Sequence, residues 1–238
     1  MDGVSNSSRL IKKTGSGLRH AFRSLKYRNY RLFFSGQAVS LIGTWMQQVA
    51  VSWLAYRLTG SNIILGTVAF CAQIPVFFLS PFTGALGDRW DRRRILFAVQ
   101  IAAMIQALAL FIVTLTGVVN ASHLVLLSLA SGVINSFEMP TRQAFLLEMV
   151  DDVNDLPNAI ALNSAVFNSS RLIGPALAGI IVALAGEAVC FGINSASYLA
   201  SALAFVLMST TPSLSSRKSR LLNDIREGFR YAAGHRLV

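Results

Sequence analysis

The stretch GALGDRWDRRR, from Gly84 to Arg94, carries two acids and four arginines between two long runs without charge. Residues 58–87, which include its first glycines, contain no Asp, Glu, Lys or Arg, and neither do residues 95–137 after it. A helix needs about 20 mostly apolar residues to cross the hydrocarbon core of a bilayer. The stretch is therefore predicted to be a short turn between two membrane-spanning helices.

The rest of the chain has the composition of a polytopic membrane protein. Hydrophobic residues make up 53% of its 238 residues and charged residues only 13%, against about a quarter in ordinary globular domains. A net charge of +10 would indicate a nucleic-acid partner in a soluble protein. Here we expect no nucleic acid, because the basic residues flank apolar runs. Cys71 and Cys190 lie alone and the three histidines are scattered, so no disulfide, metal site or cofactor is expected.

The apolar runs divide into six predicted membrane-spanning helices. Their approximate bounds are 32–56, 63–82, two helices within 95–137 that divide near 117–123, 157–184 and 188–208. The predicted fold class is an all-α integral membrane protein with a six-helix transmembrane bundle at 25–211. Residues 1–24 are expected to form a basic, partly disordered cytoplasmic segment, and 212–238 a cytoplasmic loop segment that leads towards a seventh helix.

The lysines and arginines predict the orientation of the bundle. Nineteen of the 21 lie in segments on one side of the six predicted helices. Arg57 lies on the other side, and Arg171 lies within a predicted helix. Because cytoplasmic loops carry the excess of basic residues, both termini are predicted to be cytoplasmic.

The charged turn itself has a recognisable spacing. Asp88 and Arg92 are four residues apart, which suits an ion pair on a helical turn, and Gly84 would let another backbone approach closely. The pattern Gly-x-Leu-x-Asp-Arg-x-x-Arg-Arg resembles the loop motif between the second and third helices of the major facilitator superfamily. The resemblance implies that the chain is the N-terminal six-helix half of that fold.

The same resemblance assigns roles within the turn. It implies that Asp88 and Arg92 form a cytoplasmic latch that engages the opposite half in the outward-open state, with Gly84 as a close-contact site. Arg89 and Arg93 would be flanking charges. The sequence departs from the family pattern at Asp91, where a glycine is usual, and this acid could add a second ion pair. On the simpler alternative the arginines only hold the turn in the cytoplasm.

The fifth predicted helix contains the stretch SRLIGPALAG, residues 170–179. It resembles the glycine-proline motif of antiporters in the same superfamily, with a serine in place of the first glycine. The resemblance implies an exporter-type kink at Gly174, Pro175 and Gly179, and a proline does remove a backbone hydrogen bond from a helix. Alternatively, this is a packing helix in which the proline is tolerated.

Two charged residues stand out as candidates for function. Arg171 lies midway along the fifth predicted helix, where an arginine costs at least ~2.5 kcal/mol, so it should face a water-filled cavity or bind a partner. If the helix begins later, Arg171 has a structural role near the cytoplasm. The nearest acid is Glu138, at the cytoplasmic end of the fourth predicted helix. It is expected to pair with Arg142 in the following loop, and it is a possible proton-coupling acid.

Substrate contacts are predicted from the family, in which the first and fourth helices line the cavity. The polar or amphipathic side chains on these helices that suit a cavity are Gln37, Trp45, Gln47, Gln48, Trp53 and Asn135. On the alternative interpretation the tryptophans pack or anchor the helices. The glutamines would then form hydrogen bonds between helices.

Further segments resemble the enterobactin-exporter-like branch of the superfamily: YRNYRLFFSGQ at 27–37, PTRQAF at 140–145 and ALNS at 161–164. This branch implies a multi-pass protein of the bacterial inner membrane. It implies proton-coupled export of a small amphipathic molecule, such as a drug, siderophore or metabolite, by alternating access. The chain would need a second six-helix half, either a missing C-terminal part or another half-unit. The alternative is a membrane scaffold or binding protein. Enzymes are not favoured, since motifs for serine hydrolases, zinc proteases and nucleotide-binding loops are absent.

Overall fold

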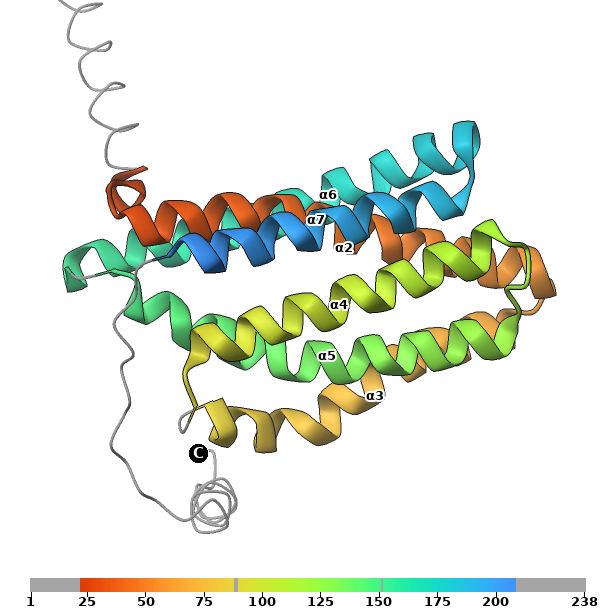
Figure 1. Ribbon diagram of the computed structural model, residues 1–238, viewed down its shortest axis with the longest axis horizontal. Coiled ribbons are helices and arrows are strands. Elements are labelled where there is room, and N and C mark those ends of the chain that lie inside the picture. Colours follow the sequence, from red (N-terminus) through yellow and green to blue (C-terminus); the bar gives the residue numbers. More distant parts are fainter. Residues whose placement is uncertain (1–21, 88–89, 151, 209–238) are drawn as a thin grey trace, which may run out of the picture.

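A computed structural model describes residues 22–87, 90–150 and 152–208 (Figure 1). This part of the chain is helical and contains no strand. Two short 3-10 helices, η1 and η2, lie at Arg23–Lys26 and Val153–Asp155. The long helices are α2 (Arg28–Thr59), α3 (Asn62–Gly87), α4 (Arg92–Leu115), α5 (Ala121–Glu148), α6 (Leu156–Ala185) and α7 (Glu187–Leu207).

Each of the six predicted helices corresponds to one long helix of the structure. The largest difference is in α5, which continues through Pro140 to Glu148, whereas the prediction ended it at residue 137. Arg142 therefore lies in α5 and not in the following loop, where the prediction had placed it. The prediction stopped at the first charge, but Glu138 and Arg142 are one turn apart and neutralise each other.

Five of the long helices in the described part of the chain are long and apolar enough to cross a membrane. These are α3, α4, α5, α6 and α7, and the span of α6 also includes η2. Helix α2 has 32 residues and is long enough, but it is not among the five because polar side chains such as Gln37, Gln47 and Gln48 lower its hydropathy. That α2 crosses the bilayer stays a prediction.

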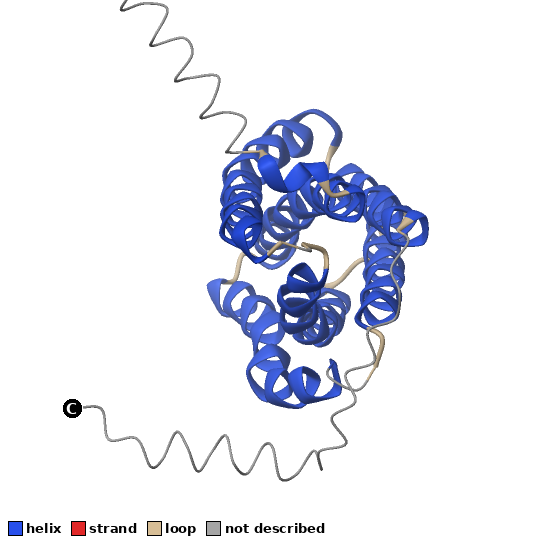
Figure 2. Cartoon of the chain, turned by 90° about the vertical axis from the view of Figure 1, so that its left-hand side faces the viewer, coloured by secondary structure: helices blue, strands red, loops and turns tan. Residues whose placement is uncertain are grey.

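The helices form two groups that run alongside each other (Figure 1). Helices α2, α6 and α7 pack together, and so do α3, α4 and α5, while contacts between α4 and α7 join the groups. Successive helices are antiparallel, and an end view shows them as a bundle of roughly parallel rods (Figure 2). The start of η1 and the end of α7 lie at the same end of the bundle, which we call the termini end.

Small residues allow the closest helix contacts. A Cβ atom built on Gly174 of α6 would lie 2.6 Å from Cβ of Trp45 and 2.9 Å from the carbonyl oxygen of Ile42, both on α2. On α5, a Cβ atom at Gly132 would lie 2.6 Å from the carbonyl oxygen of Ala72 on α3. Interfaces of this kind are typical of membrane helices, where small side chains let backbones approach.

A buried polar network ties the two groups together. Gln47 Nε2 of α2 donates to Gln106 Oε1 of α4 at 3.0 Å, and Asn194 Nδ2 of α7 donates to Gln47 Oε1 at 2.9 Å. Gln106 Nε2 donates in turn to the carbonyl of Leu127 on α5 at 3.0 Å. Gln47 is buried, so of the two interpretations of this residue the structure supports the hydrogen bond between helices.

Candidate functional site

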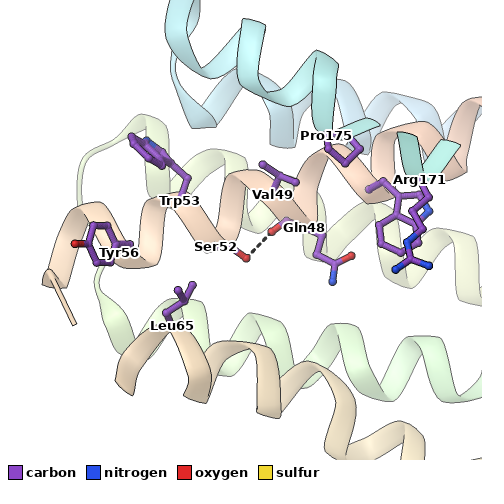
Figure 3. A pocket seen from close by; sticks show the side chains of 9 residues that line it. Gln48, Val49, Ser52, Trp53, Tyr56, Leu65, Arg171 and Pro175 are labelled. Atoms are coloured by element: carbon purple, nitrogen blue, oxygen red, sulfur yellow. Dashed lines mark hydrogen bonds between the residues drawn. The ribbon is translucent and has the colours of Figure 1, made fainter. Parts of the chain in front are cut away.

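A groove of about 540 Å³ runs along α2, between α3 and α6 (Figure 3). Its lining comes from three helices. The residues are Trp45, Gln48, Val49, Ser52, Trp53 and Tyr56 of α2, Leu65 of α3, and Arg171 and Pro175 of α6.

The sequence of α2 explains why one helix supplies most of the lining. The six lining positions of α2 follow each other at intervals of three and one, so they share one face. The opposite face is buried against the neighbouring helices and includes Met46, Gln47, Ala50 and Leu54. In the groove, Trp53 and Tyr56 are 53% and 47% exposed, which leaves a wide aromatic surface without a partner in the bundle.

Arg171 lies at one end of this groove. Its guanidinium carbon is 5.5 Å from the centroid of the Trp45 ring, a cation–π contact. The side chain is exposed, and it forms no ion pair or hydrogen bond within the described part of the chain. The close contact at Gly174, three residues further along α6, holds this part of α6 against α2 and so positions Arg171 over Trp45.

Pro175, the centre of the predicted kink, also lines the groove. It lies inside α6, which continues as a helix from Leu156 to Ala185. Gly174 is buried at the contact with α2, whereas Gly179 is exposed. A Cβ atom built on Gly179 would meet no described atom within 4 Å.

A buried ion pair lies on α5, facing α2. Arg142 Nη1 is 3.7 Å from Glu138 Oε1, and the two side chains are only 8% and 13% exposed. The same nitrogen donates a long hydrogen bond of 3.4 Å to Gln37 Oε1 on α2. Gln37 thus contacts the ion pair and does not line the groove, and Asn135, half-buried on α5, does not line it either.

Two aromatic rings connect the ion pair to the groove. The guanidinium carbon of Arg142 is 5.9 Å from the centroid of Phe167 on α6. The Phe167 and Trp45 rings meet edge to face with centroids 5.8 Å apart, and Arg171 stacks on the far ring. We call Arg142, Phe167, Trp45 and Arg171 the cation–aromatic row. It joins α5, α6 and α2.

The arginines of the charged turn hold the termini end of the bundle together. Asp88 and Arg89 of the predicted latch lie outside the described residues. Arg92 forms an ion pair with Glu148, the last residue of α5. Arg93 was expected to be a flanking charge, but it binds the end of α7: its Nε and Nη2 donate to the carbonyls of Phe205 at 2.7 Å and Val206 at 3.0 Å. A cation there stabilises the helix dipole.

The two remaining predictions for this turn have different outcomes. Asp91 caps α4, because its Oδ1 accepts a hydrogen bond from the backbone nitrogen of Arg93 at 2.9 Å. It also pairs with Arg94 at 3.4 Å, so the second ion pair is present. A Cβ atom at Gly84 would meet no described atom within 4 Å. The close helix contact predicted there is therefore not found in the described part of the chain.

The sequence analysis missed a charged cluster that attaches η1 to the start of α6. Asp155 is fully buried and lies 2.5 Å from Arg23 Nε and 2.7 Å from Lys26 Nζ. Tyr27 donates its hydroxyl to Asp155 Oδ2 at 2.9 Å. The hydrogen bond to Asp155 raises the pKa of Lys26 above its ordinary value. The partners are about 130 residues apart, and nothing in their local sequence links them.

A second missed pair closes the opposite end of the bundle. Arg57 Nε and Nη2, at the end of α2, donate to the two carboxylate oxygens of Glu187, at the start of α7, at 2.8 and 3.0 Å. The sequence did contain a signal for this contact. Arg57 and Glu187 are the one cation and the one acid in the predicted loops on that side.

Comparison with known proteins gives one family and several transporters. The profile of the transmembrane secretion effector family matches residues 19–238. The staphyloferrin A transporter of Staphylococcus aureus is 27% identical over 169 residues, which are 68% of this chain and 42% of that protein. The multidrug efflux pump Tap of Mycolicibacterium fortuitum is 25% identical over 191 residues, 77% of this chain and 47% of the pump.

Macrolide efflux protein A of Streptococcus pyogenes is 24% identical over 160 residues, 66% of this chain and 39% of that protein. The chain thus spans less than half the length of these three relatives.

Proposed function

Because the chain belongs to the transmembrane secretion effector family, within the major facilitator superfamily, we propose that it is one six-helix half of a secondary active exporter. Family membership and the apolar helices make it a multi-pass bacterial membrane protein and not an enzyme. The proposed cargo is a small amphipathic molecule, such as a drug, siderophore or other metabolite. The names of the relatives, a staphyloferrin A transporter, a multidrug efflux pump and a macrolide efflux protein, support this range.

The observation that carries the proposal is the polar content of the groove. Arg171 lies midway along the apolar helix α6, and Gln48 and Ser52 of α2 line the same groove. Facing lipid, an arginine at that depth would cost at least ~2.5 kcal/mol. This face of the bundle is therefore proposed to border a water-filled cavity against a second six-helix half, as in transporters built from two repeats. The second half would come from the same polypeptide or from another half-unit.

Alternating access needs a contact that stabilises one state. We assign this role to the latch of Asp88 and Arg92, flanked by Gly84, Arg89 and Arg93. The position of Arg92 supports the assignment, because its ion pair with Glu148 lies at the termini end, where a second half would meet the bundle. On the proposed orientation this end is cytoplasmic.

Glu138 is the proposed coupling acid. It is almost buried and pairs with Arg142, and the cation–aromatic row leads from this pair to the groove. Protonation of Glu138 would cancel its attraction for Arg142 and release the guanidinium towards Phe167. A change of protonation could in this way reach Trp45 and Arg171 without direct contact between proton and cargo. Gly174, Pro175 and Gly179 would let α6 bend beside the groove.

Everted membrane vesicles that contain the full-length protein provide the test. Three dansyl probes of nearly equal size are used: N-dansylglycine, its neutral amide, and the amine N-dansylethylenediamine. Respiration should drive uptake of at least one probe, and a protonophore, Asp88→Asn or Glu138→Gln should reduce that uptake to the level of vesicles without the protein. Arg31→Gln, an exposed arginine at the start of α2, is the control. Absence of uptake for all three probes would favour the scaffold alternative.

A further inference from the structure

We propose that the groove selects amphipathic anions. A carboxylate or a similar acidic group would bind Arg171, and an apolar or aromatic body would lie on Trp45, Trp53 and Tyr56. This inference rests on the proposed function, because it names the class of molecule taken by the same groove.

The charge of the lining supports this choice. Arg171 is the one formally charged side chain among the described residues that line the groove, and Gln48 and Ser52 are neutral. No aspartate or glutamate is in the lining. In a site walled by apolar side chains, a cation attracts an anion and repels a second cation much more strongly than it would in bulk water. The lining therefore favours amphipathic molecules with an acidic group over amphipathic molecules with a basic group.

The geometry of Arg171 fits it for recognition of a carboxylate. Its described contact is with the Trp45 ring, whose centroid lies 5.5 Å from the guanidinium carbon. A cation–π contact occupies none of the guanidinium N–H donors in a hydrogen bond, and these donors match the two oxygens of a carboxylate. Arg142 is not available in this way, because it forms an ion pair with Glu138 and donates a hydrogen bond to Gln37.

The shape of the groove supplies the second half of the recognition. Figure 3 shows Arg171 at one end, Trp53 and Tyr56 at the other, and Gln48 between them. A volume of about 540 Å³ lies within the range of roughly 300–1,000 Å³ that is typical of sites for small organic molecules. An anionic head at Arg171 would thus place its apolar body along the exposed aromatic stripe of α2. An inside-negative membrane potential would also favour the export of such an anion.

Binding of the three dansyl probes to the detergent-solubilised full-length protein tests the selectivity. Energy transfer from Trp45 and Trp53 to the dansyl group reports occupancy of the groove. N-dansylglycine should bind at least about tenfold more tightly than its amide, which is the lower end of the contribution of a charge-assisted hydrogen bond, and the amine should bind most weakly. Arg171→Gln should weaken only the carboxylate probe, to the level of the amide. Arg171→Lys should retain part of the preference, and Arg31→Gln should retain all of it.

The outcomes separate this inference from the proposed function. Equal affinity for the three probes, tighter binding of the amine, an unchanged preference in Arg171→Gln, or no binding at all would overturn the anion selectivity. Uptake of the amide or amine into energised vesicles, without uptake of the carboxylate, would leave export standing and refute the inference. Preferred binding of the carboxylate without transport of any probe would support the anion selectivity and refute the proposed export.

Discussion

Arg142 and Arg171 lie at the two ends of one row of side chains and differ in almost every other respect. Arg142 is buried and paired with Glu138, whereas Arg171 is exposed in the groove and stacks on Trp45. A buried charge needs its partner, since an uncompensated charge in the interior is strongly destabilising. An exposed charge on a cavity wall is available for a ligand. The same residue type is thus expected to serve stability and coupling at one end and recognition at the other.

The largest expected effect comes from leaving Arg142 without its acid. Glu138→Ala should lower the free energy of unfolding by about 3–5 kcal/mol, as is usual when one member of a buried pair is removed. Denaturation of the full-length protein in mixed detergent micelles measures this. The double variant Glu138→Ala with Arg142→Met should recover most of the loss, because no charge then remains buried. If the single variant is as stable as the wild type, Arg142 is not held in place by this acid.

The positions of the helices were the most predictable part of the structure. Uncharged runs and turn residues predicted bounds that agree with α6 and α7 to within one residue at each end. The prediction failed where a charge lies inside a helix. A single sequence shows Glu138 and Arg142 as the start of a loop, and only the helix itself shows that the two side chains meet one turn apart and can both be buried.

The candidate site was predictable only as a set of separate features. Three were singled out as cavity side chains, one as a charge within a helix and one as a kink, and the structure brings all five to the groove: Trp45, Gln48, Trp53, Arg171 and Pro175. Gln37 and Asn135 were chosen by the same criteria and lie elsewhere. A polar side chain on a membrane helix avoids lipid. It can do so by facing a cavity or by forming a hydrogen bond to a neighbouring helix. Which of the two occurs depends on the packing of helices that are distant in sequence.

Two neighbouring arginines at the termini end differ in the same way, since one is bound and the other is exposed. Arg93 donates two hydrogen bonds to the carbonyls of Phe205 and Val206, so Arg93→Gln should lower the free energy of unfolding by about 1.5–3 kcal/mol. The neighbouring Arg94 is 85% exposed and pairs only with Asp91 at 3.4 Å. Arg94→Gln should therefore cost less than about 1 kcal/mol. Equal losses for the two variants would mean that burial and partners do not separate these arginines.

A smaller effect is expected from the contact that positions Arg171 over Trp45. Gly174→Ala places a methyl group within 3 Å of Trp45 Cβ and the Ile42 carbonyl, and overpacking of this kind costs about 1–3 kcal/mol. The better helix propensity of alanine offsets up to about 1 kcal/mol of this. Gly179→Ala is the matched control, because its Cβ atom meets no described neighbour within 4 Å. The free energy of unfolding should fall for Gly174→Ala and rise slightly for Gly179→Ala. The same sign for both would argue against the α2–α6 contact.

The smallest effect on stability is expected at Arg171 itself. An exposed cation–π contact contributes about 0.5–1 kcal/mol, so Arg171→Gln should change the free energy of unfolding by no more than that, although it removes the preference for the carboxylate probe. This separation of stability from recognition is what the comparison with Arg142 predicts. Arg142→Gln serves as the reference, since it leaves Glu138 buried without its cation and should destabilise the bundle severalfold more. If Arg171→Gln unfolds the protein as readily as Arg142→Gln, then Arg171 is a second buried structural charge, and its exposure in the six-helix bundle reflects a partner that covers it.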